Sequence, residues 1–252
     1  MTDRVLIIPA AGSGTRLRSN KPKFLTPVLG RPMISYLIDL YSDSVDLFAV
    51  VVNPSARSEG EKELALIEQR VRFFEQRDPT GMLDAILIPQ AELRTLRPVE
   101  VWVTWCDQIA ILKNTVDRLS KGDGTEEPAE SIDLLFPTMR QRNPYIHFVR
   151  DPGGRIMEVL HARESDEMPA VGESDMGLFR LSDRAYFELL PEYSREAALG
   201  VGTGERNLLP FIPWLAQRGR VETFPGHDQI EALGINTPED LERIERHRSS
   251  SE

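Results

Sequence analysis

Apolar and polar residues alternate along the first half of the chain in blocks that predict strands and helices in turn. Short continuous apolar runs are typical of strands buried on both faces of a sheet, whereas apolar residues at helical spacing predict helices packed along one side. The predicted strands are Arg4–Pro9, Asp46–Val52, Val71–Glu75 and Val99–Trp105, and the predicted helices are Met33–Tyr41, Ala56–Arg70, Gly81–Leu93 (interrupted or ended near Pro89) and Gln108–Leu119. This order predicts a parallel sheet with helices on both faces.

The second half of the chain is less regular. An Asp-Pro-Gly-Gly turn at 151–154 predicts a hairpin, and Thr237-Pro238 is a typical helix start. The predicted elements are strands at Ile132–Thr138, Tyr145–Arg150, Arg155–Leu160, Glu173–Leu181 and Val221–Phe224, helices at Asn207–Gln217 and Thr237–Arg246, and polar or glycine-rich loops at Lys121–Glu130, His161–Val171 and Ala198–Glu205. We therefore expect one α/β domain over residues 1–248, with a mixed, mostly parallel sheet, and a frayed tail at 249–252.

Composition and charge narrow the functional classes. The 252 residues include 30 Lys and Arg against 40 Asp and Glu, a net charge of −10, which disfavours nucleic acid and anionic membranes as general partners. No apolar run reaches the ~18 residues of a membrane span, and the short N-terminal apolar stretch predicts a first strand rather than a signal peptide. The single cysteine, Cys106, excludes an internal disulfide and fits a reducing compartment, so we expect a cytoplasmic protein. The oligomeric state is not indicated.

The strongest local signal is the segment Pro9-Ala-Ala-Gly-Ser-Gly-Thr-Arg-Leu17, followed by Pro22-Lys23. It leaves the carboxyl end of the first predicted strand, where open α/β sheets bind their ligands. Gly12 and Gly14 allow a ligand to approach the backbone, whose N–H groups can donate to phosphate oxygens. Arg16 and Lys23 add two positive charges, so the segment predicts an anion-binding loop.

Other phosphate-binding motifs fit this loop less well. A dinucleotide fingerprint requires Gly or Ala where Leu17 stands, and the helix that normally begins there would be broken at Lys21-Pro22. A P-loop requires Gly-Lys-Ser/Thr, which is absent. These mismatches disfavour an NAD-dependent dehydrogenase and a P-loop enzyme; a tight turn without a ligand is the structural alternative.

Gly12-Ser-Gly-Thr-Arg-Leu17 with Pro22-Lys23 resembles the signature of sugar nucleotidyltransferases, the sugar-1-phosphate pyrophosphorylases. The fold of that family is Rossmann-like and is named the nucleotide-diphospho-sugar transferase fold. The resemblance continues in the same order through most of the chain, at Gln76 with Gly81–Ala85, Trp105–Gln108, Glu173–Gly177 and Gly234–Thr237.

The resemblance implies a reaction in which an NTP and a sugar-1-phosphate give an NDP-sugar and pyrophosphate. Small-molecule substrates are then the expected partners and Mg²⁺ the expected cofactor. The implied roles are nucleotide binding for Ala10, Ala11, Gly12, Gly14, Gln76 and Gly81, catalysis for Arg16 and Lys23, sugar binding for Glu173 and Asp175, and metal binding for Asp107 and Asn236.

Each of these side chains also has a plain structural interpretation. A carboxylate at the end of a buried strand, such as Asp107, is costly unless it is solvated or paired with a cation, but Asp107 could instead cap a helix beginning at Gln108. Asn236 could be a turn or capping residue, Gln76 a solvated strand end, and Glu173 a surface residue.

Three positions depart from the family pattern, and two of them, Asp175 and His161, leave the acceptor open. Met82 stands where the family often has Thr, and Asp175 where relatives often have Asn; an ionised Asp accepts hydrogen bonds but cannot donate them. By its spacing from the hairpin, His161 stands where the family often has a sugar-binding Glu.

The implied chemistry needs no general base, because the attacking oxygen belongs to an ionised phosphate. Catalysis would consist of positioning and electrostatic stabilisation. Alternatives are a cytidylyltransferase or molybdopterin nucleotidyltransferase, which have a similar loop, and a catalytically silent nucleotide-sugar-binding regulatory protein. A silent protein should have lost Arg16, Lys23 or Asp107, and all three are present. Neither the base nor the sugar is identified.

Overall fold

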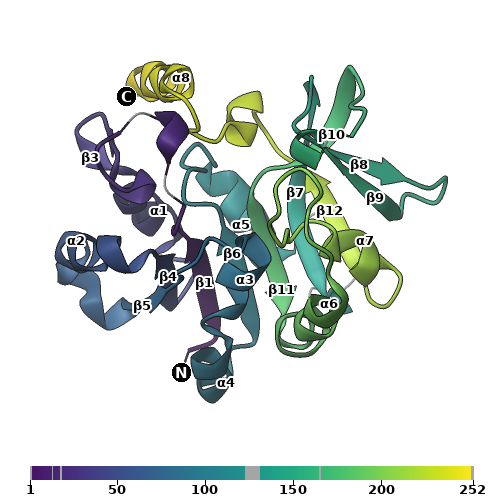
Figure 1. Cartoon of the computed structure of the whole chain (residues 1–252), viewed down its shortest axis with the longest axis horizontal. Helices are drawn as coiled ribbons and strands as arrows, with labels where there is room; N and C mark the ends of the chain where they lie inside the picture. Colours follow the sequence, from purple (N-terminus) through teal and green to yellow (C-terminus); the bar gives the residue numbers. More distant parts are fainter. Residues whose placement is uncertain (1, 13, 18, 123–130, 165, 251–252) are drawn as a thin grey trace.

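The computed structural model describes residues 2–12, 14–17, 19–122, 131–164 and 166–250. A central sheet crosses the molecule with helices packed on both of its faces (Figure 1). Its strands are β1 (Arg4–Pro9), β4 (Leu47–Val52), β5 (Val71–Glu75), β6 (Glu100–Thr104), β7 (Leu134–Arg142), β10 (Val171–Asp175), β11 (Leu178–Ser182) and β12 (Val221–Pro225). The spatial order is β10-β7-β11-β6-β1-β4-β5, and β12 pairs with β7 beside this path.

The sheet is mixed but mostly parallel. β1 pairs in parallel with β4 and β6, β4 with β5, and β12 with β7. β11 runs antiparallel to β6 and β7, and β10 antiparallel to β7. This arrangement confirms the fold class that was predicted from the pattern and from the family resemblance.

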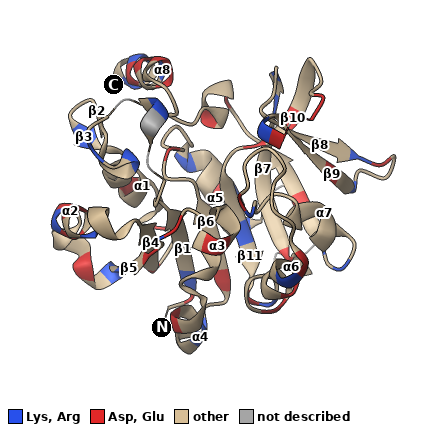
Figure 2. Cartoon of the chain, in the orientation of Figure 1, with Lys and Arg blue, Asp and Glu red and all other residues tan. Residues whose placement is uncertain are grey.

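The helices and two small hairpins complete the fold. No helix in the described residues combines the length and the apolar character needed to cross a membrane. Acidic and basic residues are interspersed along the outer elements (Figure 2). The remaining elements are α1 (Met33–Tyr41), α2 (Arg57–Glu63), α3 (Met82–Leu87), α4 (Gln90–Leu96), α5 (Lys113–Lys121), α6 (Leu190–Glu196), α7 (Phe211–Ala216), α8 (Pro238–Ser249), the hairpin β2 (Pro27–Val28) with β3 (Arg31–Pro32), and the hairpin β8 (Ile146–Arg150) with β9 (Ile156–His161).

The two faces of the sheet bury two separate cores. On β1, Leu6 and Ile8 belong to the core that includes α1 and α5, whereas Val5 and Ile7 belong to the core that includes α3 and α7. Because both faces are covered, successive side chains are all apolar, and the strand is a continuous apolar run in the sequence.

Several predicted elements have different bounds. The predicted helix Ala56–Arg70 is broken: α2 ends at Glu63, and a 3₁₀ turn at Ala65–Arg70 contains a non-helical residue, Ile67. After residue 56, only Gly60 and Leu64 of this segment are buried. A longer helix would therefore gain little from packing, which is the main source of helix stability in proteins.

The predicted helix Gln108–Leu119 begins five residues late, at Lys113. The reason is a buried carboxylate, because Glu231 accepts a hydrogen bond from the Leu112 backbone N–H (3.0 Å) and so holds the preceding turn in place. The late start also means that Asp107 does not cap this helix.

The predicted strand Glu173–Leu181 is two strands, β10 and β11, separated at Gly177. Gly177 has φ +67°, and a Cβ there would overlap the Trp105 ring. The chain therefore turns at Gly177 so that β10 and β11 pair with different parts of β7.

The helical segment from 185 to 196, which includes α6, was not predicted, although its buried Tyr186, Leu189, Leu190 and Tyr193 have helical spacing. The helix predicted at Asn207–Gln217 is shorter (α7), and the last helix extends to Ser249. Residues 123–130 of the predicted acidic loop and residues 251–252 of the predicted tail lie outside the described residues.

The Gly177 turn gives a stability test. Gly177→Ala should lower the melting temperature more than Gly30→Ala. Both positions have left-handed φ (+67° and +81°), which costs a non-glycine residue roughly 1–2 kcal/mol. A Cβ at Gly30 meets nothing within 4 Å, whereas at Gly177 overpacking should add about 1–3 kcal/mol. Equal melting temperatures by calorimetry would contradict this packing argument.

Candidate active site

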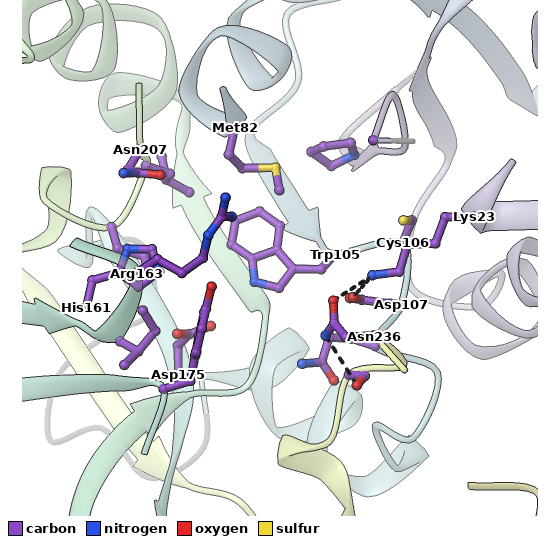
Figure 3. Close-up of a pocket in the computed structure, with 18 of the residues that line it drawn as sticks. Lys23, Met82, Trp105, Cys106, Asp107, His161, Arg163, Asp175, Asn207 and Asn236 are labelled. Atoms are coloured by element: carbon purple, nitrogen blue, oxygen red, sulfur yellow. Dashed lines mark hydrogen bonds and ion pairs between the residues drawn. The ribbon is translucent and has the colours of Figure 1, made fainter. Parts of the chain in front are cut away.

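The carboxyl ends of β1, β5 and β6 open onto a cavity of about 680 Å³ (Figure 3). This is the edge at which an open α/β sheet binds its ligands. The predicted site residues that line it are Ala11, Gly12, Gly14, Arg16, Lys23, Gln76, Gly81, Asp107, Asp175 and Asn236. Segments that are distant in sequence therefore meet around one space.

One wall of the cavity is organised around the Lys23 ammonium group. Lys23 Nζ donates hydrogen bonds to Asp107 Oδ2 and to Asn236 Oδ1, the latter at 3.0 Å (Figure 3). Arg16 Nη2 donates to the same Asn236 oxygen at 3.0 Å. The two predicted catalytic cations and the two predicted metal ligands thus form one cluster.

The glycine loop brings Lys23 into this position. Gly14 has φ +60°, and a Cβ there would lie only 3.0 Å from Lys23 Cβ. Phe24 and Leu25, which follow Lys23, are buried and anchor the segment. A Cβ at Gly12 would meet nothing within 4 Å, so this glycine borders open space in the cavity.

Asn236 is positioned by the start of α8. The N-cap of this helix is Thr237, and Asp240 completes a capping box with it. Asp240 Oδ2 also accepts a hydrogen bond from the Asn236 backbone N–H (3.1 Å), while the Ile235 N–H donates to the Asp107 carbonyl (3.1 Å). The Asn236 side chain is therefore not needed as a cap and is directed at the cluster.

The cluster fits a magnesium ion that binds together with a substrate. One ammonium group bonds both oxygens, so Asp107 and Asn236 are close enough to share a single cation. Mg²⁺ is commonly held by one or two protein oxygens together with phosphate oxygens and water. Across the described ranges, no group of three or more His, Cys, Asp or Glu side chains could hold a metal. Substrate oxygens would therefore have to complete the coordination.

Gln76 and Gly81 form a fixed corner of the cavity. Gln76 Nε2 donates to the Gly81 carbonyl at 3.0 Å. The Gln76 side chain therefore closes the loop between Gln76 and Gly81. Gly81 has φ +125°, and a Cβ there would overlap the backbone of Arg206, whose N–H donates to the Thr80 carbonyl (2.8 Å). A glycine is required at position 81 because the backbone of Arg206 approaches it closely, and not because a ligand does.

Asp175 and His161 lie on the opposite side of the cavity from Lys23 (Figure 3). Burial raises the pKa of Asp175 to about 6, and the hydrogen bond from the Gly177 N–H (2.8 Å) only partly opposes this effect. Burial also lowers the pKa of His161, and its Nε2 is buried without a hydrogen-bond partner among the described residues. On this side of the cavity, therefore, Asp175 is hydrogen-bonded, whereas one nitrogen of His161 has no partner among the described residues.

The structure places two predicted site residues outside the cavity lining. Ala10 is 3% exposed, and its N–H donates to the Val51 carbonyl (2.7 Å), which extends the pairing of β1 with β4. Glu173 forms a two-pronged ion pair with Arg150 (2.7 and 2.8 Å) that ties β8 to β10. Burial alone would raise the pKa of Glu173, but the hydrogen bonds from Arg150 and Thr138 lower it.

The sequence analysis missed the residues that shape the far side of the cavity. Arg163 lines it, and its side chain extends toward Met82 and Trp105 (Figure 3). The neighbouring Glu164 accepts hydrogen bonds from Gly202 N–H (2.6 Å), Thr203 Oγ1 (2.6 Å) and Asn207 Nδ2 (3.0 Å). The glycine-rich segment was a visible signal, but nothing in the sequence linked it to Glu164.

Cys106 also lines the cavity. The thiol is buried, and burial raises its pKa to about 12. A thiol that stays protonated is a poor nucleophile. Cys106 is therefore a packed side chain in the cavity wall and not a nucleophile.

Comparison with known proteins identifies the family. The MobA-like NTP transferase domain matches residues 6–173, two thirds of the chain. The chain belongs to this family. It is therefore a nucleotidyltransferase domain, which confirms the family resemblance drawn from the motifs.

Several curated relatives are named bifunctional protein GlmU. The protein from Thermodesulfovibrio yellowstonii is 26% identical over 246 residues, covering 96% of this chain and 51% of the relative. The Aquifex aeolicus protein is 27% identical over 248 residues (95% and 52%), and that of Shouchella clausii 27% over 240 residues (94% and 50%). The chain of this NTP transferase thus spans about half the length of the curated relatives it matches.

The raised pKa of Asp175 predicts a pH-dependent stability. An acid whose pKa is raised by folding destabilises the folded state when it is ionised. This destabilisation by the ionised Asp175 is absent when the pH is below the usual pKa of 3.8, and it is complete when the pH is above about 6. Asp175→Asn should therefore raise the melting temperature at about pH 8 and have little effect at about pH 3.5. Asp78→Asn, at an exposed position, is the control, and an equal gain at both pH values would contradict the burial effect.

Proposed function

We propose that this protein is a sugar-1-phosphate nucleotidyltransferase that joins an NTP to a sugar-1-phosphate and releases pyrophosphate. The supporting observation is the convergence of Arg16, Lys23, Asp107 and Asn236 at the glycine loop. The NTP transferase family and the relatives named GlmU agree with it. A buried, unpaired cysteine fits the cytoplasmic location that we propose.

In the proposed reaction, a phosphate oxygen of the sugar-1-phosphate attacks the α-phosphorus of the NTP. The bond between the α-phosphorus and its bridging oxygen breaks, and pyrophosphate leaves with that electron pair. The attacking oxygen is already ionised, so no side chain has to remove a proton. The barrier arises from bringing two polyanions together, which fixed positive charges reduce.

The side chains have distinct proposed roles. Lys23 and Arg16 neutralise the triphosphate and the charge that develops on the transferred phosphate, and the backbone at Gly12 and Gly14 leaves room for phosphate oxygens. Asp107 and Asn236 hold Mg²⁺, which supplies charge neutralisation and orients the phosphates when it is bound. Lys23 then has to exchange the Asp107 and Asn236 oxygens for phosphate oxygens.

A second candidate is transfer of a nucleotide to another phosphorylated acceptor, such as an alcohol phosphate. The observation that favours it is the side of the cavity opposite Lys23, where His161 and Asp175 stand at positions at which the family often has Glu and Asn. The regulatory alternative is weaker, because Arg16, Lys23 and Asp107 are retained and clustered.

A direct test measures pyrophosphate release with the four NTPs against a panel of sugar-1-phosphates in the presence of Mg²⁺. Release with one sugar-1-phosphate, and formation of the NDP-sugar by mass spectrometry, would support the proposal. Release only with alcohol phosphates would favour the second candidate. No release, together with a melting temperature raised by an NTP, would favour the regulatory protein.

Lys23→Ala should lower kcat by roughly 10²–10³, the scale for removing one preorganised electrostatic group. Lys21→Ala is the matched control, because Lys21 is an exposed lysine two residues away. Steady-state kinetics of both variants test the role. A Lys23→Ala enzyme with a kcat close to that of the Lys21→Ala enzyme would refute it.

Metal binding should compete with the Lys23 ammonium group. Lys23→Met should increase the affinity for Mn²⁺ without nucleotide, because Asp107 and Asn236 lose their internal cation. Asp107→Ala should lose Mn²⁺ binding with or without NTP, and chelation by EDTA should abolish activity of the unmodified enzyme. Electron paramagnetic resonance of Mn²⁺ measures the bound fraction. Unchanged activity in EDTA, or Mn²⁺ binding retained by Asp107→Ala, would refute the metal assignment.

A further inference from the structure

A second cavity, of about 580 Å³, lies beside the candidate active site. Three arginines line it: Arg140 and Arg142 from β7, and Arg243 from α8. The other lining residues are Gln141, Val171, Gln229, Ala232 and Leu233, so no carboxylate of the described residues lines this space. We call it the arginine pocket.

The three guanidinium groups have no ion-pair partner in the part of the chain that the structure describes. They are exposed, and none forms an ion pair or a side-chain hydrogen bond within the described ranges. On α8, Glu239 and Glu242 are near Arg243 in sequence, but neither pairs with it. Elsewhere on the molecule, basic and acidic residues are interspersed, for example along α2 (Figure 2). Three unpaired arginines around one hollow therefore stand out in a chain of net charge −10.

The backbone fixes the pocket. Arg140 and Arg142 are two residues apart on β7, so their side chains leave the same face of the strand. Gln229 Nε2 donates to the Arg140 carbonyl (3.0 Å), which fastens the segment before α8 to this strand. The arginines are thus held near one another by the sheet and by a hydrogen bond, rather than by a flexible loop.

The pocket and the active-site cavity share a wall. Gln141, Ala232 and Leu233 line both spaces. Leu233 is followed by Gly234, where a Cβ would lie 3.3 Å from the Asp107 carboxylate. A ligand in the arginine pocket is therefore separated from the proposed reaction centre by only one short segment.

We propose that the arginine pocket binds a phosphate group other than the phosphates that react. Planar guanidinium groups bind phosphate through paired hydrogen bonds, and three like charges gain most from a multiply charged anion. Two kinds of ligand carry such a phosphate group. One is an acceptor substrate with a second, distal phosphate, and the other is a free polyphosphate that regulates the enzyme. The site is inferred from the pocket itself; only the distinction between these sources rests on the proposed function.

The binding test uses inorganic tripolyphosphate as the probe, without Mg²⁺, in isothermal titration calorimetry. Lys23→Ala is the starting protein, so that phosphate binding at the reaction centre is weakened. Adding Arg140→Gln, Arg142→Gln and Arg243→Gln should weaken tripolyphosphate binding by roughly tenfold or more, which corresponds to losing one or two charge-assisted hydrogen bonds.

The control makes the same change in charge at another place. Arg97, Arg155 and Arg195 are exposed and form no ion pair in the described structure, so replacing all three by Gln tests long-range charge alone. A loss of affinity in the pocket variant but not in this control would support the site. Equal losses, or no loss in the pocket variant, would overturn it. Melting temperatures show that each variant is folded.

Kinetics with otherwise unmodified enzyme separate the two sources. If the pocket holds a distal phosphate of the acceptor, the pocket variant raises KM only for acceptors with a second phosphate. If it holds a free polyphosphate, KM is unchanged, and the response of the rate to added tripolyphosphate disappears. If the protein has no transferase activity but the pocket variant still loses tripolyphosphate binding, the proposed function is refuted and the arginine pocket is supported. If the enzyme is active but the pocket variant binds tripolyphosphate as before, the proposed function is supported and the arginine pocket is refuted.

Discussion

A single ammonium group joins three parts of the chain that are far apart in the sequence. Lys23 Nζ bonds the carboxylate at the end of β6 and the amide oxygen before α8. Its side chain is only 13% exposed and that of Asp107 only 12%, so each charge depends on the other, since an unpaired charge at this depth is costly. The need for Gly14 beside Lys23 and the capped start of α8 both follow from keeping this cation in place. When a metal ion and a triphosphate bind, Asp107 would exchange Lys23 for the metal ion, and Lys23 would exchange Asp107 for phosphate oxygens. Both side chains are already charged in the unliganded site, so binding would change their partners but not their ionisation.

Charge is distributed unevenly around the ligand cavity, although the chain as a whole is acidic. Lys23 and Arg16 lie on one side, Arg163 on the other, and the arginine pocket beyond a shared wall. Asp107 is matched by Lys23, and burial favours the protonated form of Asp175. Glu205 and Asp240 also line the cavity, so its cations are concentrated at the glycine loop and at Arg163 without exceeding its carboxylates in number.

The sequence was sufficient for features that depend on local pattern and on strand order. β1 was predicted at its observed bounds because both of its faces are buried, and the common site of Lys23, Asp107 and Asn236 was expected from the family resemblance. Features that depend on tertiary contact were not predicted. The turn at Gly177 reflects the nearby Trp105 ring, and the late start of α5 reflects a carboxylate more than a hundred residues away. The arginine pocket likewise combines β7 with α8, which no local pattern connects.

The side of the cavity that carries Arg163 and His161 also depends on contacts between segments that are distant in the sequence. A Cβ at Gly202 would overlap the Arg163 carbonyl, so the glycine-rich segment packs directly against the turn that carries Arg163. Glu164, whose pKa is lowered by hydrogen bonds, chiefly from Thr203, fastens the two segments together. From composition alone, one segment was predicted to be a polar loop and the other a glycine-rich loop, yet each fixes the other and directs Arg163 and His161 at the ligand space. In the proposed reaction, acceptor specificity would depend on this pair of segments, whereas nucleotide binding would depend on the glycine loop. The two halves of the cavity can vary separately within one fold, because they are built from different parts of the chain.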